Sequence, residues 1–426
     1  MDIFFLLPLL LLLAGLMTRL WLGLRQIRHV QHHRETVPLA FEKHVALADH
    51  QRAADYTVSR TQFMLASTLL SALLFLGWTI VGGLGLLHSS LERFLGTGLL
   101  QQVTFLACFI LVGRILTVPL SWWATFRIED RFGFNRRSLR LWMEDGVKSF
   151  VLLTLIGLPT LTAGLWLMGE VGQTWWLWVW GLTMVFVLLQ LQVYPAVIAP
   201  LFNDFKPLRD LSLQSRVDSL MSRCGFVSKG LFVMDSSRRS SHGNAYFTGL
   251  GPSKRVVFFD TLLTLLSPAE IDAVLAHELG HFRRRHIPKY LGIIFLLTGV
   301  CLAGLSLAAD APGFYTGLGV TPPSSIDQNP ALALALMMLV VPLFATFISP
   351  FLASYLRRNE FEADAYAGEH ANSEDLASAL IKLYRNNAST LTPDPIYVRF
   401  YHSHPTVAER LRRLRGLDAA LVPKAG

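Results

Sequence analysis

Two histidines and the glutamate between them carry the clearest chemical signal in the chain, in AHELGHF at residues 276–282. His277 and His281 are four residues apart, so on a helix both imidazoles project from one face. Such a pair can bind one zinc ion, and Glu278 is then close enough to act on water at the metal. The spacing therefore predicts a hydrolytic zinc site, with His277 and His281 as ligands and Glu278 as the general base.

A hydrolytic zinc site usually has a third protein ligand and leaves the fourth position to water. The extended motif with a third histidine fails, because Arg284 and Ile287 occupy its Gly and His positions. His286 lies five residues beyond His281, off the ligand face of the helix. We interpret His286 as a polar residue at the membrane interface, so the third ligand must come from elsewhere.

The best source of a third ligand is RRNEFEADAYAG at 357–368. Glu360 and Asp364 are four residues apart, so one carboxylate could bind zinc while the other orients a ligand histidine through its free ring N–H. Spacing favours Glu360 as the ligand. The alternative is a solvated helix whose acids face water, which is how we interpret Glu362 and Glu369.

Two further polar clusters are candidates for the same site. SSHGNAYFTG at 240–249 predicts a turn into a strand that contains Asn244, Ala245 and Tyr246. If this strand is an exposed edge, an extended peptide could bind as an added strand; an internal hairpin strand is an equal alternative. YHSHPTVAERL at 401–411 contains His404 and Arg410, and either side chain could stabilise an oxyanion. The alternative there is an ordinary loop.

The composition requires that these residues work in a membrane. Of 426 residues, 52% are hydrophobic and 16% are charged, and the mean hydropathy is +0.42, whereas a soluble domain has about 25% charged residues. The net charge of +8 is spread over loops between apolar runs, which argues against a nucleic-acid partner. The three cysteines are too scattered for a disulfide framework or a thiolate zinc site.

Seven segments are long and apolar enough to span a bilayer as helices. They lie near 3–24, 62–88, 98–122, 149–169, 174–200, 287–309 and 331–356. The first could be a signal peptide, but it lacks a basic start and a clear cleavage site, so a retained span is favoured. Loops 25–61 and 123–148 are rich in Arg and Lys, whereas 310–330 has neither. The positive-inside rule then places the N-terminus outside and the zinc site on the cytoplasmic side.

The polar insertion 201–286 has the best signals of a water-soluble domain. Strand-like runs occur at 231–235, 244–250 and 255–260, and Ser267-Pro268-Ala269-Glu270 is a capping box that starts a helix near 268. The fold class is therefore mostly α, with about seven transmembrane helices and a small α+β zinc domain. The predicted parts are 1–200 with five transmembrane helices, 201–286 with the protease core, 287–356 with helices six and seven, and 357–426, which is helical and completes the site.

Taken together, the motifs resemble a known family. HGNAYFTG, HELGH, RRNEFEADAYA and HSHPTVAERL, with EDRFGFNRR (129–137) and YPAVIAPLFNDFKPL (194–208), resemble the type I CAAX prenyl endopeptidases, which are integral-membrane zinc proteases. The resemblance implies seven helices around a water-filled chamber that the zinc domain caps. It further implies the following roles: zinc ligands His277, His281 and Glu360, base Glu278, supporting acid Asp364, substrate-aligning strand residues Asn244, Ala245 and Tyr246, and His404 and Arg410 beside the transition state.

The chain departs from the family where Thr406 stands in place of a second proline and where the C-terminal VPKAG lacks a retrieval signal. With an excess of Arg over Lys, these features suggest a bacterial inner-membrane protein. The expected substrate is a peptide or protein, hydrophobic or lipid-modified. A broad quality-control protease resembling the HtpX proteases in its role is the alternative, and a membrane scaffold with structural zinc is a weaker one.

Overall fold

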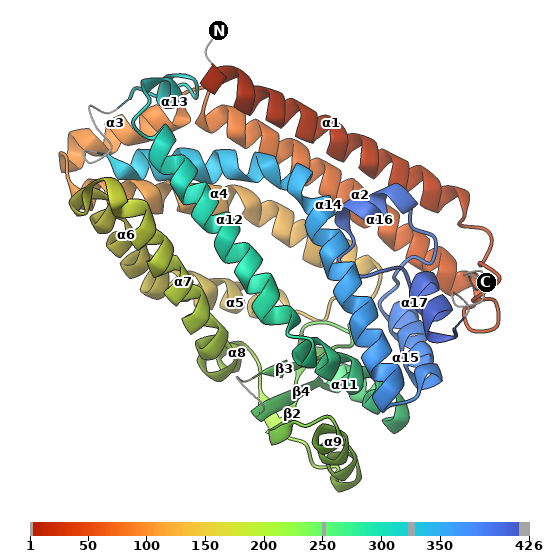
Figure 1. Cartoon of the computed structure of the whole chain (residues 1–426). Helices are drawn as coiled ribbons and strands as arrows, with labels where there is room; N and C mark the ends of the chain where they lie inside the picture. The colour runs from red at the N-terminus through yellow and green to blue at the C-terminus, as the bar shows by residue number, and fades with distance from the viewer. Residues whose placement is uncertain (1–2, 249–252, 323–328, 417–426) are drawn as a thin grey trace, which may run out of the picture.

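The computed structural model describes residues 3–248, 253–322 and 329–416 (Figure 1). Within these ranges, seven helical segments are long and apolar enough to cross a membrane. They are Phe5–His32, Leu47–Trp78, Leu99–Glu129, Leu139–Glu170, Gly172–Phe202, His286–Ala308 and Pro330–His370. The predicted number of spans is confirmed.

The spans are built from both continuous and interrupted helices. The elements are α1 (Ile3–His32), α2 (Leu47–Trp78), α4 (Leu99–Trp123) with π-helix η1 (Ala124–Glu129), α5 (Leu139–Leu152) with π-helix η2 (Leu153–Gly157) and α6 (Leu158–Glu170), the 3₁₀ turn η3 (Gly172–Thr174), α7 (Trp175–Val193) with π-helix η4 (Tyr194–Ile198) and α8 (Ala199–Phe202), α12 (His286–Ala308) and α14 (Pro330–His370). Two short helices, α3 (Gly83–Leu95) and α13 (Pro312–Thr316), lie at the end of the bundle opposite the sheet (Figure 1).

The predicted span 62–88 is wrong in its boundaries. Helix α2 begins at Leu47, because the chain continues as helix outside the apolar segment that hydropathy detects. It ends at Trp78, and Gly82 follows with φ 87°, a left-handed conformation that favours glycine. The rest of the predicted span is a turn at 79–82 and the start of α3, a separate helix.

The seventh span is longer than predicted. Helix α14 starts at Pro330, where the Asn329 side chain accepts a hydrogen bond from the Leu332 amide, and it runs unbroken to His370. The predicted span and the predicted acidic helix at 357–370 are thus one element. Glu360 and Asp364 are consequently held by a helix anchored in the membrane, beside α11 (Figure 1).

A four-stranded sheet lies at one end of the bundle (Figure 1). Its strands are β1 (Phe205–Pro207), β2 (Val227–Met234), β3 (Ala245–Thr248) and β4 (Ser253–Phe259), in the order β1-β2-β4-β3. Strand β2 is parallel to β4, and the other pairs are antiparallel. All three predicted strands are present, β1 was not predicted, and residues 249 and 250 of the second lie outside the described ranges.

Further helices lie at this end of the bundle, and most of them pack around the sheet. They are α9 (Leu211–Arg223), the 3₁₀ turn η5 (Ser236–Arg238), α10 (Asp260–Leu265), α11 (Pro268–Arg283), α15 (Ser373–Asn386), α16 (Pro395–Tyr401) and α17 (Val407–Leu414). The buried apolar side chains of α9, α10, α11, α15 and α17 form one core with the sheet, and Phe41 and Val45 from the loop after α1 join it. Helix α16 packs instead against α14 and α1. The basic loops 33–46 and 130–138 therefore meet the domain built on this sheet, the second through a bridge from Asn135 to Ser240.

Arg114 lines a cavity inside the helix bundle. The cavity measures about 560 Å³ and lies between α1, α2, α4 and α14. Arg19 lines it too, and its Nε donates to the buried Thr346 hydroxyl at 2.7 Å. Of the two alternatives for an arginine in an apolar run, lining a cavity or reaching back to the membrane surface, the structure supports the first.

Candidate metal centre

Helix α11 presents the two histidines, and its start is fixed by a complete capping box. The Ser267 hydroxyl accepts from the Glu270 amide, and the Glu270 carboxylate accepts from the Ser267 amide at 2.7 Å. Glu270 also accepts from Lys382 at 2.7 Å and from Ser378 at 2.6 Å on α15. The predicted helix start near 268 is confirmed. The hydrogen bonds from α15 to Glu270 also fix the rotation of α11 about its own axis.

Gly280 lets α11 lie directly against α14. A Cβ added at Gly280 would be 3.1 Å from both Ala363 Cα and Tyr366 Cβ, closer than ordinary van der Waals contact. The glycine inside the HELGH motif therefore brings the histidine face within reach of the acids on α14.

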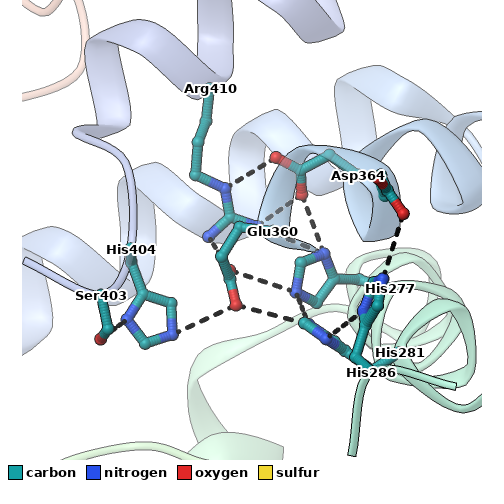
Figure 2. A network of polar contacts seen from close by, with 9 residues as sticks. His277, His281, His286, Glu360, Asp364, Ser403, His404 and Arg410 are labelled. Carbon is teal, nitrogen blue, oxygen red and sulfur yellow. Dashed lines mark hydrogen bonds and ion pairs between the residues drawn. The ribbon is translucent and has the colours of Figure 1, made fainter. Parts of the chain in front are cut away.

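Three potential ligand atoms converge between these helices (Figure 2). The Nε2 atoms of His277 and His281 are 3.2 Å apart, and the Glu360 oxygens lie 3.6 Å from His277 Nε2 and 3.4 Å from His281 Nε2. Ligand atoms ~2.0–2.2 Å from a tetrahedral zinc ion would be roughly 3.3–3.6 Å from one another. The three side chains therefore fit a single zinc ion.

The Glu360 carboxylate supports the same interpretation. Glu360 is 7% exposed, and its Oε2 is buried without a hydrogen-bond partner among the described residues. A buried carboxylate oxygen without a partner is costly unless a cation satisfies it. Of the groups of His, Cys, Asp and Glu in the described part of the chain, this one has the geometry of a metal site.

Asp364 holds His277 from the side away from these ligand atoms. His277 Nδ1 is 2.8 Å from Asp364 Oδ1, which leaves Nε2 free for a metal. Although burial opposes it, hydrogen bonding to Asp364 and Glu360 raises the pKa of His277 to about 9. The two carboxylates thus favour positive charge at this position, which a bound cation supplies.

Arg410 on α17 is buried against Asp364. Its Nε donates to Asp364 Oδ2 at 2.8 Å and its Nη2 to Oδ1 at 2.5 Å, while Nη1 lies 3.6 Å from Glu360 Oε2. These contacts favour a role in holding Asp364 and Glu360.

Thr406 starts α17 with a capping box to Glu409, so the departure from proline at this position has a structural use.

His404 and Glu278 are the two predicted catalytic side chains that remain available to a substrate. The His404 side chain is 63% exposed, and its Nε2 is 3.5 Å from Glu360 Oε1. Figure 2 shows His404 beside Glu360, on a different segment from the two ligand histidines. Glu278 is half-buried and makes no hydrogen bond or ion pair with another described residue. Both can therefore take up new partners.

His286 begins the sixth membrane-length helix, as a residue at the membrane interface would, but its side chain is buried against protein groups. His286 is 4% exposed, and its Nδ1 lies 3.0 Å from His281 Nδ1. Its Nε2 lies 3.2 Å from Glu362, which is therefore not purely solvent-facing as expected. Helix α11 ends at Arg283, and Arg285 has φ 57°, so the five-residue spacing no longer describes positions on one helix. The turn brings His286 back beside His281.

The predicted substrate strand is an edge strand. Among the described strands, β3 pairs with β4 alone and ends the sheet. Asn244 is exposed just before it, Ala245 is buried, and Tyr246 is half-buried, with burial raising the pKa of Tyr246 to about 12. The structure therefore favours the exposed edge over the internal strand.

A cluster with the geometry of a metal site on a helix–helix contact, with one helix rooted in the membrane, is the arrangement of an integral-membrane metalloenzyme. Residues 26–204 match the family described as CAAX prenyl protease N-terminal, five membrane helices, and residues 207–418 match peptidase family M48. The chain therefore belongs to peptidase family M48, within the CAAX prenyl protease group. The resemblance seen in the sequence is confirmed, as is the predicted enzyme class.

Individual relatives agree with this assignment. The chain is 34% identical over 323 residues to the CAAX prenyl protease 1 homolog of Arabidopsis thaliana, covering 75% of this chain and 74% of the relative. It is 35% identical over 325 residues to CAAX prenyl protease 1 of Saccharomyces cerevisiae, covering 74% and 72%. Its fold matches the crystal structure of S. mikatae Ste24p with a TM-score of 0.91, 29% identity and coverage of 97% and 99%.

Proposed function

We propose that this protease uses one zinc ion, held by His277, His281 and Glu360, to hydrolyse peptide bonds. The observation that carries the proposal is the convergence of the three potential ligand atoms, together with a buried Glu360 oxygen that accepts no hydrogen bond from the described residues. Zinc, when bound, supplies a Lewis acid that polarises the scissile carbonyl and acidifies water toward a pKa of about 7. The chain's own side chains supply the remaining chemistry.

Glu278 acts as the base. Its carboxylate takes a proton from the attacking water, whose oxygen bonds to the carbonyl carbon, and it returns that proton to the leaving amine as the C–N bond breaks. The lack of competing hydrogen bonds to Glu278 in the described residues supports this role. The exposed His404 donates a hydrogen bond to the developing oxyanion. Asp364 and Arg410 hold His277 in place.

Strand β3 aligns the substrate. A peptide that adds to the free edge of β3 forms backbone hydrogen bonds there, which orient the chain without demanding a particular side chain. Asn244, Ala245 and Tyr246 would then contact the residues around the scissile bond. The enclosing spans would form the chamber that admits the hydrophobic part of the substrate.

The substrate class is a peptide with a hydrophobic or lipid-modified end, as the names of the CAAX prenyl protease relatives suggest. A broad quality-control protease is the alternative. Cleavage rates of a farnesylated peptide and its unmodified counterpart distinguish them, because a quality-control protease would cleave both alike.

We further propose that the protein resides in a bacterial inner membrane with the N-terminus outside and the zinc site facing the cytoplasm. The basic loops 33–46 and 130–138 contact the zinc domain, so they lie at its end of the bundle. The positive-inside rule assigns that end to the cytoplasm.

The experiment that tests the proposed mechanism compares wild-type protein with Glu278→Gln in detergent. We expect the variant to retain one zinc per chain and to lose cleavage of a peptide substrate, because the amide cannot accept the proton. Glu369→Gln is the matched control. It removes a carboxylate on a different helix, α14, and should cleave normally. Full activity of Glu278→Gln would refute the assignment of the base.

A further inference from the structure

His286 lies beside His281 (Figure 2), and together with Glu362 it forms a second series of contacts behind the proposed metal site. His286 Nδ1 is 3.0 Å from His281 Nδ1, and His286 Nε2 is 3.2 Å from Glu362 Oε2. Glu362 in turn accepts from Arg358 Nε at 3.1 Å. The series runs from a proposed zinc ligand to a carboxylate on α14.

The positions of the ring protons follow from the geometry. His281 Nε2 faces Glu360 and His277, so it is the nitrogen that a metal would bind. The neutral His281 ring then carries its proton on Nδ1 and donates it to His286 Nδ1. His286 must therefore carry its own proton on Nε2, which donates to Glu362. One set of tautomers satisfies every contact, with each proton directed away from the metal.

The two ligand histidines thus have parallel supports. His277 reaches a carboxylate directly, at 2.8 Å from Asp364, which Arg410 holds. His281 reaches Glu362 through an intervening imidazole. A hydrogen bond from the far ring nitrogen to a carboxylate fixes the orientation of a metal-binding histidine and raises its basicity.

The backbone at this point is shaped to place His286. Arg285 is one of two non-glycine residues in the described ranges with positive φ, at 57°, and it precedes α12 as its cap. A left-handed conformation is unfavourable for a residue with a side chain, because its Cβ crowds the following carbonyl oxygen. This conformation occurs where the chain reverses direction between α11 and α12. The reversal places the His286 imidazole in contact with His281.

We propose that His286, together with Glu362, is a positioning relay that fixes the metal-binding tautomer of His281 and strengthens its bond to zinc. The inference rests on the proposed zinc ligands and goes beyond them, because neither residue touches the metal or the substrate. It requires His286 to act through its Nδ1 acceptor and Glu362 to act through His286.

The test measures the rate at which zinc-loaded full-length protein in detergent releases zinc to an excess of a colorimetric chelator. His286→Ala removes the acceptor, and we expect zinc release 10–100-fold faster than wild type, the usual effect of losing such a partner. In His286→Asn the amide oxygen replaces the Nδ1 acceptor, so release should be slower than from the Ala variant. The thermal midpoint of the zinc-free protein, measured in parallel, should be alike for Ala and Asn.

Glu362→Gln tests the second contact, and Glu369→Gln on the same helix is its control. We expect Glu362→Gln to speed zinc release in the wild-type background but not in the His286→Ala background, because the relay is already broken there. The control should leave release unchanged in both.

Three results would overturn the relay: release from His286→Ala within about twofold of wild type, equal release from the Ala and Asn variants, or an equal effect of Glu362→Gln in both backgrounds. If His286→Ala does not fold, His286→Asn replaces it as the broken background, because Asn does not reach Glu362. A wild-type protein that cannot be loaded with zinc would instead refute the proposed metal site itself.

Discussion

The buried pair of Asp364 and Arg410 gives the most quantitative prediction. Both side chains are almost inaccessible, at 4% and 7%, and two hydrogen bonds join them. Replacing one member alone leaves the other as a buried charge without its main partner, which typically costs 3–5 kcal/mol. We therefore expect Asp364→Asn and Arg410→Met each to lower the free energy of unfolding of the zinc-free protein by about that amount.

The double variant distinguishes a coupled pair from two independent residues. With both charges removed, no charge is left stranded, so the loss should be smaller than the sum of the single losses by about 1–3 kcal/mol. Denaturant unfolding in detergent measures the free energy of unfolding of the wild type, the two single variants and the double variant. Zinc-free protein is used, so that metal binding does not contribute. Single losses that add within about 0.5 kcal/mol would refute the argument that the pair is coupled.

Two other predictions concern how α11 is positioned. Gly280→Ala should lower stability by about 1–3 kcal/mol, because its Cβ would meet α14 at 3.1 Å. Gly304→Ala, where no atom lies within 4 Å, is the control in a thermal melt, and equal melting of the two variants would contradict the close packing. For Glu270, burial opposes ionisation, but hydrogen bonds from Lys382 and Ser378 hold the pKa of the carboxyl below its usual value of 4.5. Its contribution is therefore present above pH 4.5 and is lost as pH falls through the lowered pKa. The stability difference between wild type and Glu270→Gln, about 1–3 kcal/mol at neutral pH, should shrink in melts below pH 4.5; a difference that is constant with pH would contradict this role.

Much of the architecture could be predicted from the sequence, because a bilayer imposes a strong and local constraint. Runs of about 20 apolar residues identify membrane helices, and the capping box at Ser267 identifies the start of α11. The limits of helices outside the apolar runs were harder to predict. Helix α2 starts at Leu47 and α14 continues to His370, well beyond what hydropathy detects.

The residues of the proposed metal site could be predicted to lie together because they recur at helical spacing on single helices. The contacts of the proposed relay behind His281 could not be predicted, because they depend on the turn at Arg285. Because α11 ends at Arg283, helical spacing counted beyond that residue does not give the position of the His286 side chain. A positive φ at an arginine has no clear sequence signal. Glu362 contacts His286 only because that turn brings His286 to it.

The central claim concerns a metal site with three protein ligands and a free fourth position. Anomalous diffraction at the zinc edge, from crystals of the zinc-loaded wild-type protein, tests it most directly. The account predicts one zinc ion ~2.0–2.2 Å from His277 Nε2, His281 Nε2 and an oxygen of Glu360, with no fourth protein ligand. A zinc ion bound elsewhere, or one closed by a fourth protein side chain as in a structural site, would contradict it.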